Sequence, residues 1–240
     1  MVIAVIFAGG VGSRMRSKDI PKQFLVIHGE PILVRTVRHF QEHPRVDSIV
    51  VVSNVDWIDY CRDLLTKYGM DKVFAVVPGG STGQESIYHG LCEAERVAAG
   101  RKTVVLVHDG VRPLINADII TRNIEAVEET GSAITCVPAK ETVLVCGESG
   151  TIESIPDRSA LELARAPQSF WLDELIAAHR DAITRDRNDY IDSASMMFER
   201  GVVLTPIEGP AENMKVTTPD DFFSLQAFLN ARENQQIYGV

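Results

Sequence analysis

The 240-residue sequence has few of the residues that metal clusters and disulfide frameworks require. Its four cysteines, Cys61, Cys92, Cys136 and Cys146, form no CxxC pair and have no histidine-rich neighbourhood. Closely spaced cysteine pairs are typical of zinc sites, and a high cysteine density is typical of small disulfide-linked domains. The sequence therefore favours free thiols, and it assigns no metal ligands.

Net positive charge and long apolar runs are also missing. The chain has 24 Lys and Arg against 33 Asp and Glu, a formal net charge of -9 at pH 7, which would repel a nucleic-acid backbone. The apolar run at residues 1–7 is too short to span a membrane and lacks the basic segment of a signal peptide. We therefore expect no nucleic-acid partner, no membrane association and a cytoplasmic location.

Repeats, low-complexity segments and interdomain linkers are absent from the sequence as well, so we expect a single domain over residues 1–240. Strand-like runs alternate with helical patterns, which is typical of an α/β fold with a doubly wound, mostly parallel sheet. We predict strands at residues 1–7, 46–52, 72–77, 102–107, 132–137 and 202–205. We predict helices from Pro31 and at residues 57–68, 84–98, 117–129, 171–184, 192–200 and 219–232.

A β-hairpin interrupts this alternation. Residues 142–146 and 151–155 read as strands, and the Gly147-Glu148-Ser149-Gly150 segment between them reads as a turn. A hairpin alone buries too little surface to be stable, so this arm should pack on the body or on another subunit. We infer dimerisation through the arm, at about residues 139–165.

A glycine loop with nearby cations follows the first predicted strand. Residues 8–15 read AGGVGSRM, and Pro21-Lys22-Gln23-Phe24-Leu25 comes shortly after. Glycines let successive backbone N–H groups approach an anion, and Arg14 and Lys22 add full positive charge. The pattern predicts a polyphosphate site, in which the expected nucleotide-binding residues of the loop are Ala8, Gly9, Gly10 and Gly12.

Other readings of this loop fit less well. A P-loop needs Lys followed by Ser or Thr after its second glycine, whereas Gly12 is followed by Ser13 and Arg14. A dinucleotide fingerprint needs a small residue where Met15 stands, which disfavours a dehydrogenase. A structural turn without a ligand would explain the glycines but not the adjacent cations.

Two more polar loops follow predicted parallel strands, at residues 78–86 and 108–113. In open parallel sheets, ligands bind beyond the carboxyl ends of the strands, so all three loops should lie at one edge. Asp109 would orient a ribose, an acceptor or Mg²⁺ there, or would alternatively be a local partner for Arg112.

These loops, together with residues 166–170 (APQSF) and 213–220 (NMKVTTPD), resemble the sugar-phosphate cytidylyltransferases over nearly the whole chain. That family includes the methylerythritol-phosphate and ribitol-phosphate enzymes. The resemblance implies a nucleotide-diphospho-sugar transferase-like fold and CTP with Mg²⁺ as donor. It also implies a homodimer whose arms complete each other's acceptor sites.

The resemblance also implies roles for individual residues. The triphosphate and leaving group would be stabilised by the catalytic residues Arg14, Lys22 and Lys215. The cytosine and ribose would be bound by Gly79, Gly80, Ser81, Thr82 and Ser86, and the acceptor by Asp109, Arg112, Thr142, Arg158 and Asp192. Because a substrate phosphate is already a nucleophile at neutral pH, positioning and charge stabilisation suffice, and a Ser/His/Asp triad is not needed.

Three positions depart from many relatives. Glu141-Thr142 stands where Asp-Thr is usual, Ile191-Asp192 where Thr-Asp is usual, and Gly83 where a charged or polar residue is usual. Phe7-Ala8-Gly9-Gly10 and residues 53–57 look more like the ribitol-phosphate enzymes, so ribitol 5-phosphate is the expected acceptor. The alternatives are methylerythritol 4-phosphate as acceptor, and a catalytically silent nucleotide-binding protein.

Overall fold

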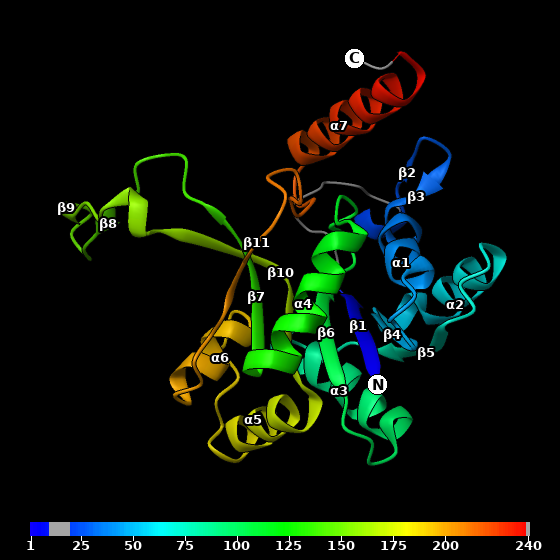
Figure 1. Ribbon diagram of the computed structural model, residues 1–240, viewed down its shortest axis with the longest axis horizontal. Helices are drawn as coiled ribbons and strands as arrows, with labels where there is room; N and C mark the ends of the chain where they lie inside the picture. The colour runs from blue at the N-terminus through cyan, green and yellow to red at the C-terminus, as the bar shows by residue number, and fades with distance from the viewer. Residues whose placement is uncertain (10–19, 239–240) are drawn as a thin grey trace.

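The computed structural model describes residues 1–9 and 20–238, with a seven-stranded sheet at the centre (Figure 1). The strand order is β11-β7-β10-β6-β1-β4-β5, and β10 runs antiparallel to its neighbours β6 and β7 while the other pairs are parallel. This confirms the predicted α/β, mostly parallel sheet. The strands are β1 Val2–Ala8, β4 Ser48–Ser53, β5 Val73–Pro78, β6 Val104–Asp109, β7 Ser132–Pro138, β10 Glu162–Trp171 and β11 Pro206–Glu208.

Helices cover both faces of the sheet. Strand β1 is buried on both sides, so its Ala4 and Ile6 pack into one apolar cluster while Ile3 and Val5 pack into another. The first cluster includes side chains of α1 (Ile32–Glu42), α2 (Ile58–Lys67) and α4 (Ala117–Thr130). The second includes side chains of α3 (Gly83–Ala98), α5 (Leu172–Thr184) and α6 (Ser193–Glu199).

The strand predicted at residues 202–205 is wrong, because the strand in this region is β11, which begins at Pro206. Residues 203 and 205 contact β7 partly through one side chain. The Ser132 hydroxyl donates to the Val203 carbonyl at 2.9 Å and accepts from the Thr205 amide at 3.0 Å. One backbone bond also joins the two segments, from the Ile134 amide to the Thr205 carbonyl at 2.8 Å, and the regular strand pairing with β7 begins at Pro206.

Strand β10 was not predicted. Its sequence holds Pro167, Gln168 and Ser169 in place of an apolar run, and a proline normally argues against a strand inside a sheet. The pairing with β7 shifts register between Ala164 and Gln168, which places the proline at an irregularity where no ladder bond is needed. The strand therefore forms through partners that are distant in sequence.

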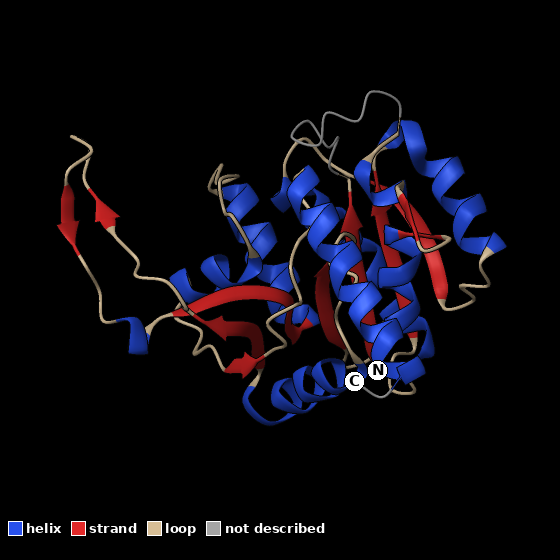
Figure 2. Ribbon diagram, turned by 90° about the horizontal axis from the view of Figure 1, so that it is seen from above, coloured by secondary structure: helices blue, strands red, loops and turns tan. Residues whose placement is uncertain are grey.

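The inserted arm projects away from the central sheet in both ribbon views (Figures 1 and 2). It carries β8 (Val145–Cys146) and β9 (Ile152–Ser154), which pair antiparallel over fewer residues than the predicted strands at 142–146 and 151–155. Its short 3-10 helix η4 spans Arg158–Ala160. Side chains of Leu144, Ile152 and Ile155 are exposed on it, as expected for an element that does not pack on its own body.

A small apolar cluster attaches the C-terminal helix α7 (Pro219–Tyr238) to the body. Leu225 and Leu229 of α7 pack with Ile32, Val111 and Val216. The short strands β2 (Val26–Ile27) and β3 (Glu30–Pro31) form a hairpin beside this cluster.

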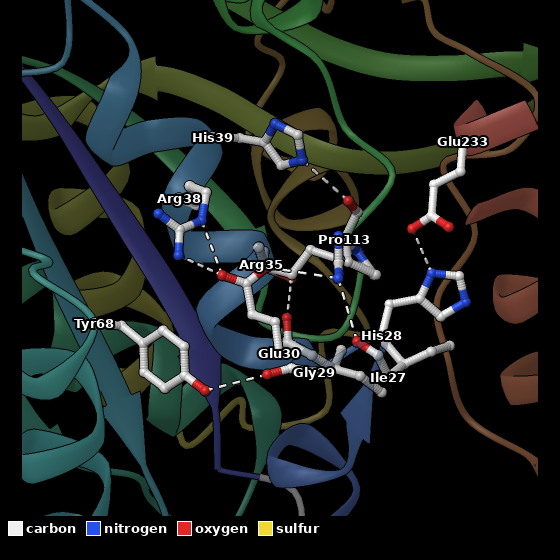
Figure 3. Close-up of polar contacts among 12 residues, drawn as sticks. Ile27, His28, Gly29, Glu30, Arg35, Arg38, His39, Tyr68, Pro113 and Glu233 are labelled. Carbon is white, nitrogen blue, oxygen red and sulfur yellow. Dashed lines mark hydrogen bonds and ion pairs between the residues drawn. The ribbon is translucent and has the colours of Figure 1, made fainter. Parts of the chain in front are cut away.

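Polar contacts reinforce that hairpin (Figure 3). His28 Nδ1 lies 2.7 Å from Glu233 Oε1 of α7, and Glu30 accepts from Arg38 of α1. Helix α7 extends to Tyr238, six residues beyond its predicted end at residue 232. Among the described residues, none of the helices has the length and apolar character needed to cross a membrane.

The four cysteines are free, as the sequence predicts. Burial raises the pKa of Cys61 to about 12 and that of Cys136 to about 11, so both stay protonated and unreactive at neutral pH. Within the described part of the chain, no group of three or more His, Cys, Asp or Glu side chains is arranged to hold a metal ion.

Candidate functional site

A cleft of about 580 Å³ lies beyond the carboxyl ends of β1, β4, β5 and β6. All three polar loops contribute to it, which confirms that they share one edge of the sheet. The predicted site residues that line it are Ala8, Gly9, Lys22, Gly79, Gly80, Ser81, Thr82, Ser86, Asp109 and Lys215. The predicted residues Gly10, Gly12 and Arg14 lie outside the described residues.

The glycine loop and the Gly79 loop meet at the floor of the cleft. A Cβ built on Gly9 would lie 3.8 Å from Gly79 Cα and 3.6 Å from Ser86 Oγ, so the two loops lie side by side with room for little more than one methyl group between them. The Gly79 amide donates to the Ser53 carbonyl of β4 at 2.7 Å. Ser53 lies opposite Ala8 of β1 in the sheet, so this bond places the Gly79 loop beside the start of the first glycine loop.

A capping box shapes the Gly79 loop at the start of α3. Thr82 Oγ1 accepts from the Glu85 amide at 3.1 Å, and the Glu85 carboxylate accepts from the Ser81 amide at 2.6 Å. Hydrogen bonds from the Ser81 hydroxyl and the Ser81 amide lower the pKa of Glu85. A Cβ on Gly80 would lie 2.2 Å from Glu85 Cγ, so only glycine fits there. Contacts within residues 80–85 therefore fix the shape of this loop.

The Ser86 hydroxyl is used within this loop. Its Oγ accepts from the Gly80 amide at 3.0 Å and donates to the Thr82 carbonyl at 2.8 Å. Ser86 was expected to meet the nucleotide; its position in the cleft wall agrees with that expectation, but its bonds hold the loop itself.

Lys22 is positioned by its neighbours at the start of the 3-10 helix η2 (Lys22–Phe24). The next residue, Gln23, is buried and donates from Nε2 to the Ala8 carbonyl at 2.7 Å. Phe24 packs against Trp57 and Tyr60, with ring centroids 5.4 and 5.0 Å apart. The Pro21-Lys22-Gln23-Phe24 motif thus anchors a lysine at the end of β1.

Asp109 lies between two cations at the end of β6. Its Oδ1 is 2.6 Å from Lys215 Nζ, and its Oδ2 is 2.6 Å from Arg112 Nε. Burial alone would raise the pKa of Asp109, but the charges of Lys215 and Arg112 lower it below its ordinary value, so the carboxylate is ionised at neutral pH. Of the two readings of Asp109, the pairing with Arg112 is present, and the residue also lines the cleft.

Arg112 is turned away from the cleft and towards the segment that carries Lys215. Its Nη1 donates to the Asn213 carbonyl at 3.0 Å, and the Val216 amide donates to the Val111 carbonyl at 2.9 Å. Arg112 therefore connects Asp109 to the backbone two residues before Lys215.

The described lining of the cleft has two cationic side chains, Lys22 and Lys215, and one acidic side chain, Asp109. The Asp109 charge is offset by its two partners, so the local balance is positive although the whole chain is acidic. Such a cleft suits a polyphosphate, with glycine-rich backbone on one wall and lysines on the other.

Besides Arg112, three predicted acceptor residues lie outside this cleft. Thr142 and Arg158 belong to the arm that projects from the body (Figure 2). There, Arg158 Nη1 donates to the Lys140 carbonyl at 3.0 Å. Asp192 caps α6 by accepting from the Ser195 amide at 2.8 Å. The structure therefore brings together the described residues of the predicted nucleotide site but not the whole predicted acceptor site.

Sequence reasoning missed several residues of the cleft wall. Asn54 follows β4, where its side chain accepts from the Asp56 amide, and the rule of strand ends would have found it. Gln23 and Thr217 lie inside quoted motifs without having been assigned a role. Their neighbours Lys22 and Lys215 carry the charges that indicate a phosphate site, whereas Gln23 and Thr217 are uncharged.

Comparisons with known proteins agree on one family. A family model described as 2-C-methyl-D-erythritol 4-phosphate cytidylyltransferase (IspD) matches residues 2–231. A ribitol-5-phosphate cytidylyltransferase from Streptococcus agalactiae serotype V is 51% identical over 240 residues, covering 100% of both chains. A 2-C-methyl-D-erythritol 4-phosphate cytidylyltransferase from Geobacter metallireducens is 39% identical over 96% of this chain and 98% of its own.

The fold has a counterpart among solved structures. The crystal structure of 4-diphosphocytidyl-2C-methyl-D-erythritol synthase from Anaerococcus prevotii superposes with a TM-score of 0.81, covering 95% of this chain and 96% of that one. The sequences are 24% identical, so this likeness concerns the fold.

Proposed function

The chain belongs to the IspD family of cytidylyltransferases, and we propose that it transfers the cytidylyl group of CTP to D-ribitol 5-phosphate, giving CDP-ribitol and pyrophosphate. The observation that carries this choice of acceptor is the 51% identity over the full length of a ribitol-5-phosphate enzyme, against 39% for a methylerythritol-phosphate enzyme. The positively charged cleft with its preformed glycine-rich wall supports binding of a nucleoside triphosphate.

In the proposed reaction, a phosphate oxygen of ribitol 5-phosphate attacks the α-phosphorus of CTP. The bond from the α-phosphorus to the bridging oxygen of the β-phosphate breaks, and pyrophosphate leaves with that electron pair. Lys22 and Lys215 stabilise the charge that develops, and Asp109 fixes Lys215 in place. The Gly79 loop and Ser86 contact the cytosine and ribose. Arg14, which lies outside the described residues, would add to the triphosphate site.

Mg²⁺ is the proposed cofactor, bound together with CTP. Magnesium is commonly held by one or two carboxylates and by substrate phosphates, with no dedicated protein cage. The described cleft has one carboxylate, that of Asp109, whose two oxygens pair with Lys215 and Arg112, so the phosphates of CTP would be the main ligands of the ion. When bound, the ion would neutralise phosphate charge and orient the triphosphate.

We also propose that the protein is one nucleotidyltransferase domain that forms a homodimer through the arm at residues 139–165. The arm extends from the body with apolar side chains exposed, and its Arg158 and Thr142 lie away from the cleft of their own subunit. In a dimer these residues would reach the partner's acceptor, where a guanidinium grips a phosphate bidentately. The cytoplasmic location stays a prediction.

All three departures from the family pattern lie at exposed or open positions. Gly83 lines the cleft, and a Cβ built there would meet nothing within 4 Å, so the position leaves space free. Ile191 is 93% exposed and offers no hydroxyl. Glu141 is exposed on the arm. These differences support an acceptor other than methylerythritol 4-phosphate.

The test is pyrophosphate release from CTP and Mg²⁺, measured in parallel with ribitol 5-phosphate, methylerythritol 4-phosphate and no acceptor. We expect release with ribitol 5-phosphate only. Release with methylerythritol 4-phosphate only would reassign the acceptor and leave the cytidylyl transfer intact. CTP binding without pyrophosphate release in any of the three reactions would contradict the proposed activity.

A further inference from the structure

The segment at residues 187–192 connects α5 to α6 and carries Ile191 and Asp192 (Figure 1). Its first two residues, Arg187 and Asn188, line a second pocket of about 360 Å³, whose lining also includes Ser81 and Thr82 of the Gly79 loop. Two glutamines from different elements bind this segment, and neither has a role in the mechanism above.

Gln84, in the first turn of α3, holds the first part of the segment. Its Nε2 donates to the Arg187 carbonyl at 2.8 Å, and its Oε1 accepts from the Tyr190 amide at 3.1 Å. The side chain is 7% exposed and lines the second pocket, not the nucleotide cleft. Gln84 thereby connects the segment to the helix whose first residues form the nucleotide loop.

Gln168, on β10, holds the other end. Its Nε2 donates to Asp192 Oδ2 at 2.9 Å, and its Oε1 accepts from the Ala194 amide at 2.9 Å. In the sheet Gln168 lies opposite Val107, two residues before Asp109 on β6. Gln84 therefore binds the segment from α3, the helix that begins at the nucleotide loop. Gln168 binds it from β10, the strand that pairs with β6.

The segment itself is braced. Arg187 Nε lies 2.9 Å from Asp189 Oδ1 and its Nη1 lies 3.3 Å from Glu199 Oε1 of α6. The Arg187 guanidinium also lies over the Tyr190 ring, 4.8 Å from its centroid. The segment is therefore held together internally. Three glutamine bonds, to Arg187, Tyr190 and Asp192, set its position, and the fourth goes to Ala194 in the first turn of α6.

We propose that Gln84 and Gln168 are positioning residues that place the 187–192 segment, and with it Ile191 and Asp192, so as to set the affinity for the polyol-phosphate acceptor. This inference rests on the proposed function and on the expected role of Asp192 at the acceptor. The segment lies next to the nucleotide loop, because its Arg187 and Asn188 line the second pocket together with Ser81 and Thr82. Neither glutamine lines the nucleotide cleft, so the affinity for CTP is set independently.

The test uses Gln84→Met and Gln168→Met, which keep the length of the side chain and remove both of its hydrogen bonds. The matched control is Gln41→Met, because Gln41 Oε1 also accepts from a backbone amide, that of Lys72 at 2.8 Å, but away from the cleft. The KM values for ribitol 5-phosphate and for CTP, the kcat and the melting temperature are measured for each. If Gln84→Met does not fold, Gln84→Glu, which still accepts from the Tyr190 amide, replaces it.

We expect each site variant to raise the KM for ribitol 5-phosphate by about five- to twentyfold, the effect of one to two lost hydrogen bonds, with the KM for CTP within about twofold of the wild type. Gln41→Met should leave both KM values unchanged. Equal rises of both KM values, or a lower melting temperature with neither KM changed, would overturn the inference. A wild-type protein without turnover would contradict the proposed function and this inference with it, whereas wild-type turnover with unchanged KM values in both site variants would overturn the positioning role alone.

Discussion

His179 on α5 makes the protein sensitive to mild acid, and its replacement by phenylalanine should relieve part of that sensitivity. The imidazole is 2% exposed and stacks on Tyr88, with ring centroids 5.9 Å apart and planes inclined by 18°. In the described structure neither of its ring nitrogens has a hydrogen-bond partner. Burial without a partner disfavours the charged imidazolium and lowers the pKa of His179 from 6.5 to about 4.

The direction of the effect follows from proton binding. As the pH falls through 6.5, His179 of the unfolded chain takes up a proton, whereas the buried side chain stays neutral until about pH 4. The unfolded state binds more protons in that window, so the free energy of unfolding decreases as the pH falls from about 6.5 to about 4. Each pH unit contributes about 1.4 kcal/mol, so the 1.5 units between pH 6.5 and pH 5 amount to about 2 kcal/mol.

The assay is urea unfolding of the wild type, His179→Phe and His179→Gln at pH 7 and pH 5. Between these two pH values, both variants should lose about 2 kcal/mol less stability than the wild type. Glutamine introduces a new buried polar group, so its stability at pH 7 should differ from that of the phenylalanine variant, while the pH effect should be the same. His108, whose pKa burial lowers to about 3, is present in all three proteins and cancels from the comparison.

An equal loss of stability in all three proteins would refute the reasoning. It would show that His179 is protonated in the folded state near pH 6, which would require water or a rearranged partner at its ring nitrogens. Equal urea m-values across the series are needed for the comparison, because they show that the same surface is exposed on unfolding.

Three further predictions concern the site and the core. Lys215→Met should lower kcat by about 10²–10³-fold with the KM for CTP little changed, because the Nζ charge acts on the developing negative charge; steady-state pyrophosphate release checks this, and an unaltered kcat would remove Lys215 from the site. Arg158→Ala should raise the KM for ribitol 5-phosphate by about tenfold or more in the same assay, whereas an effect on CTP alone would contradict its place at the acceptor. Gly90→Ala should destabilise the fold by about 1–3 kcal/mol in urea, because its Cβ would lie 2.5 Å from Val5 Cγ1 and 2.8 Å from Val52 Cγ2; wild-type stability would mean that both valines can move.

Much of the fold could be predicted because its information is local. The apolar run of β1 is buried on both faces, and α4 begins at the Asn116 cap and ends at Gly131, which has a φ of 89°. Strand β10 could not be predicted in this way. Its polar sequence around Pro167 acquires strand geometry only between β6 and β7, and both partners are distant in the chain.

The site likewise has features set by neighbouring residues, which could be predicted, and features set by distant residues, which could not. The Gly79 loop is set by a capping box within residues 80–85, and Lys22 by the residues that follow it, so short motifs identified both. The contacts of Gln84 with Arg187, 103 residues away, and of Gln168 with Asp192, 24 residues away, have no signal in the sequence.

By itself, the sequence determined a mostly parallel α/β sheet, three polar loops at strand ends and a charge pattern that suits a polyphosphate. These properties depend on neighbouring residues, through hydrophobic periodicity, caps and glycine turns. The tertiary structure alone decided that Arg112 points to the Lys215 segment and that the arm carries Arg158 away from its own cleft. Those outcomes depend on which distant groups meet when the chain closes, and a linear pattern of residue types does not encode such meetings.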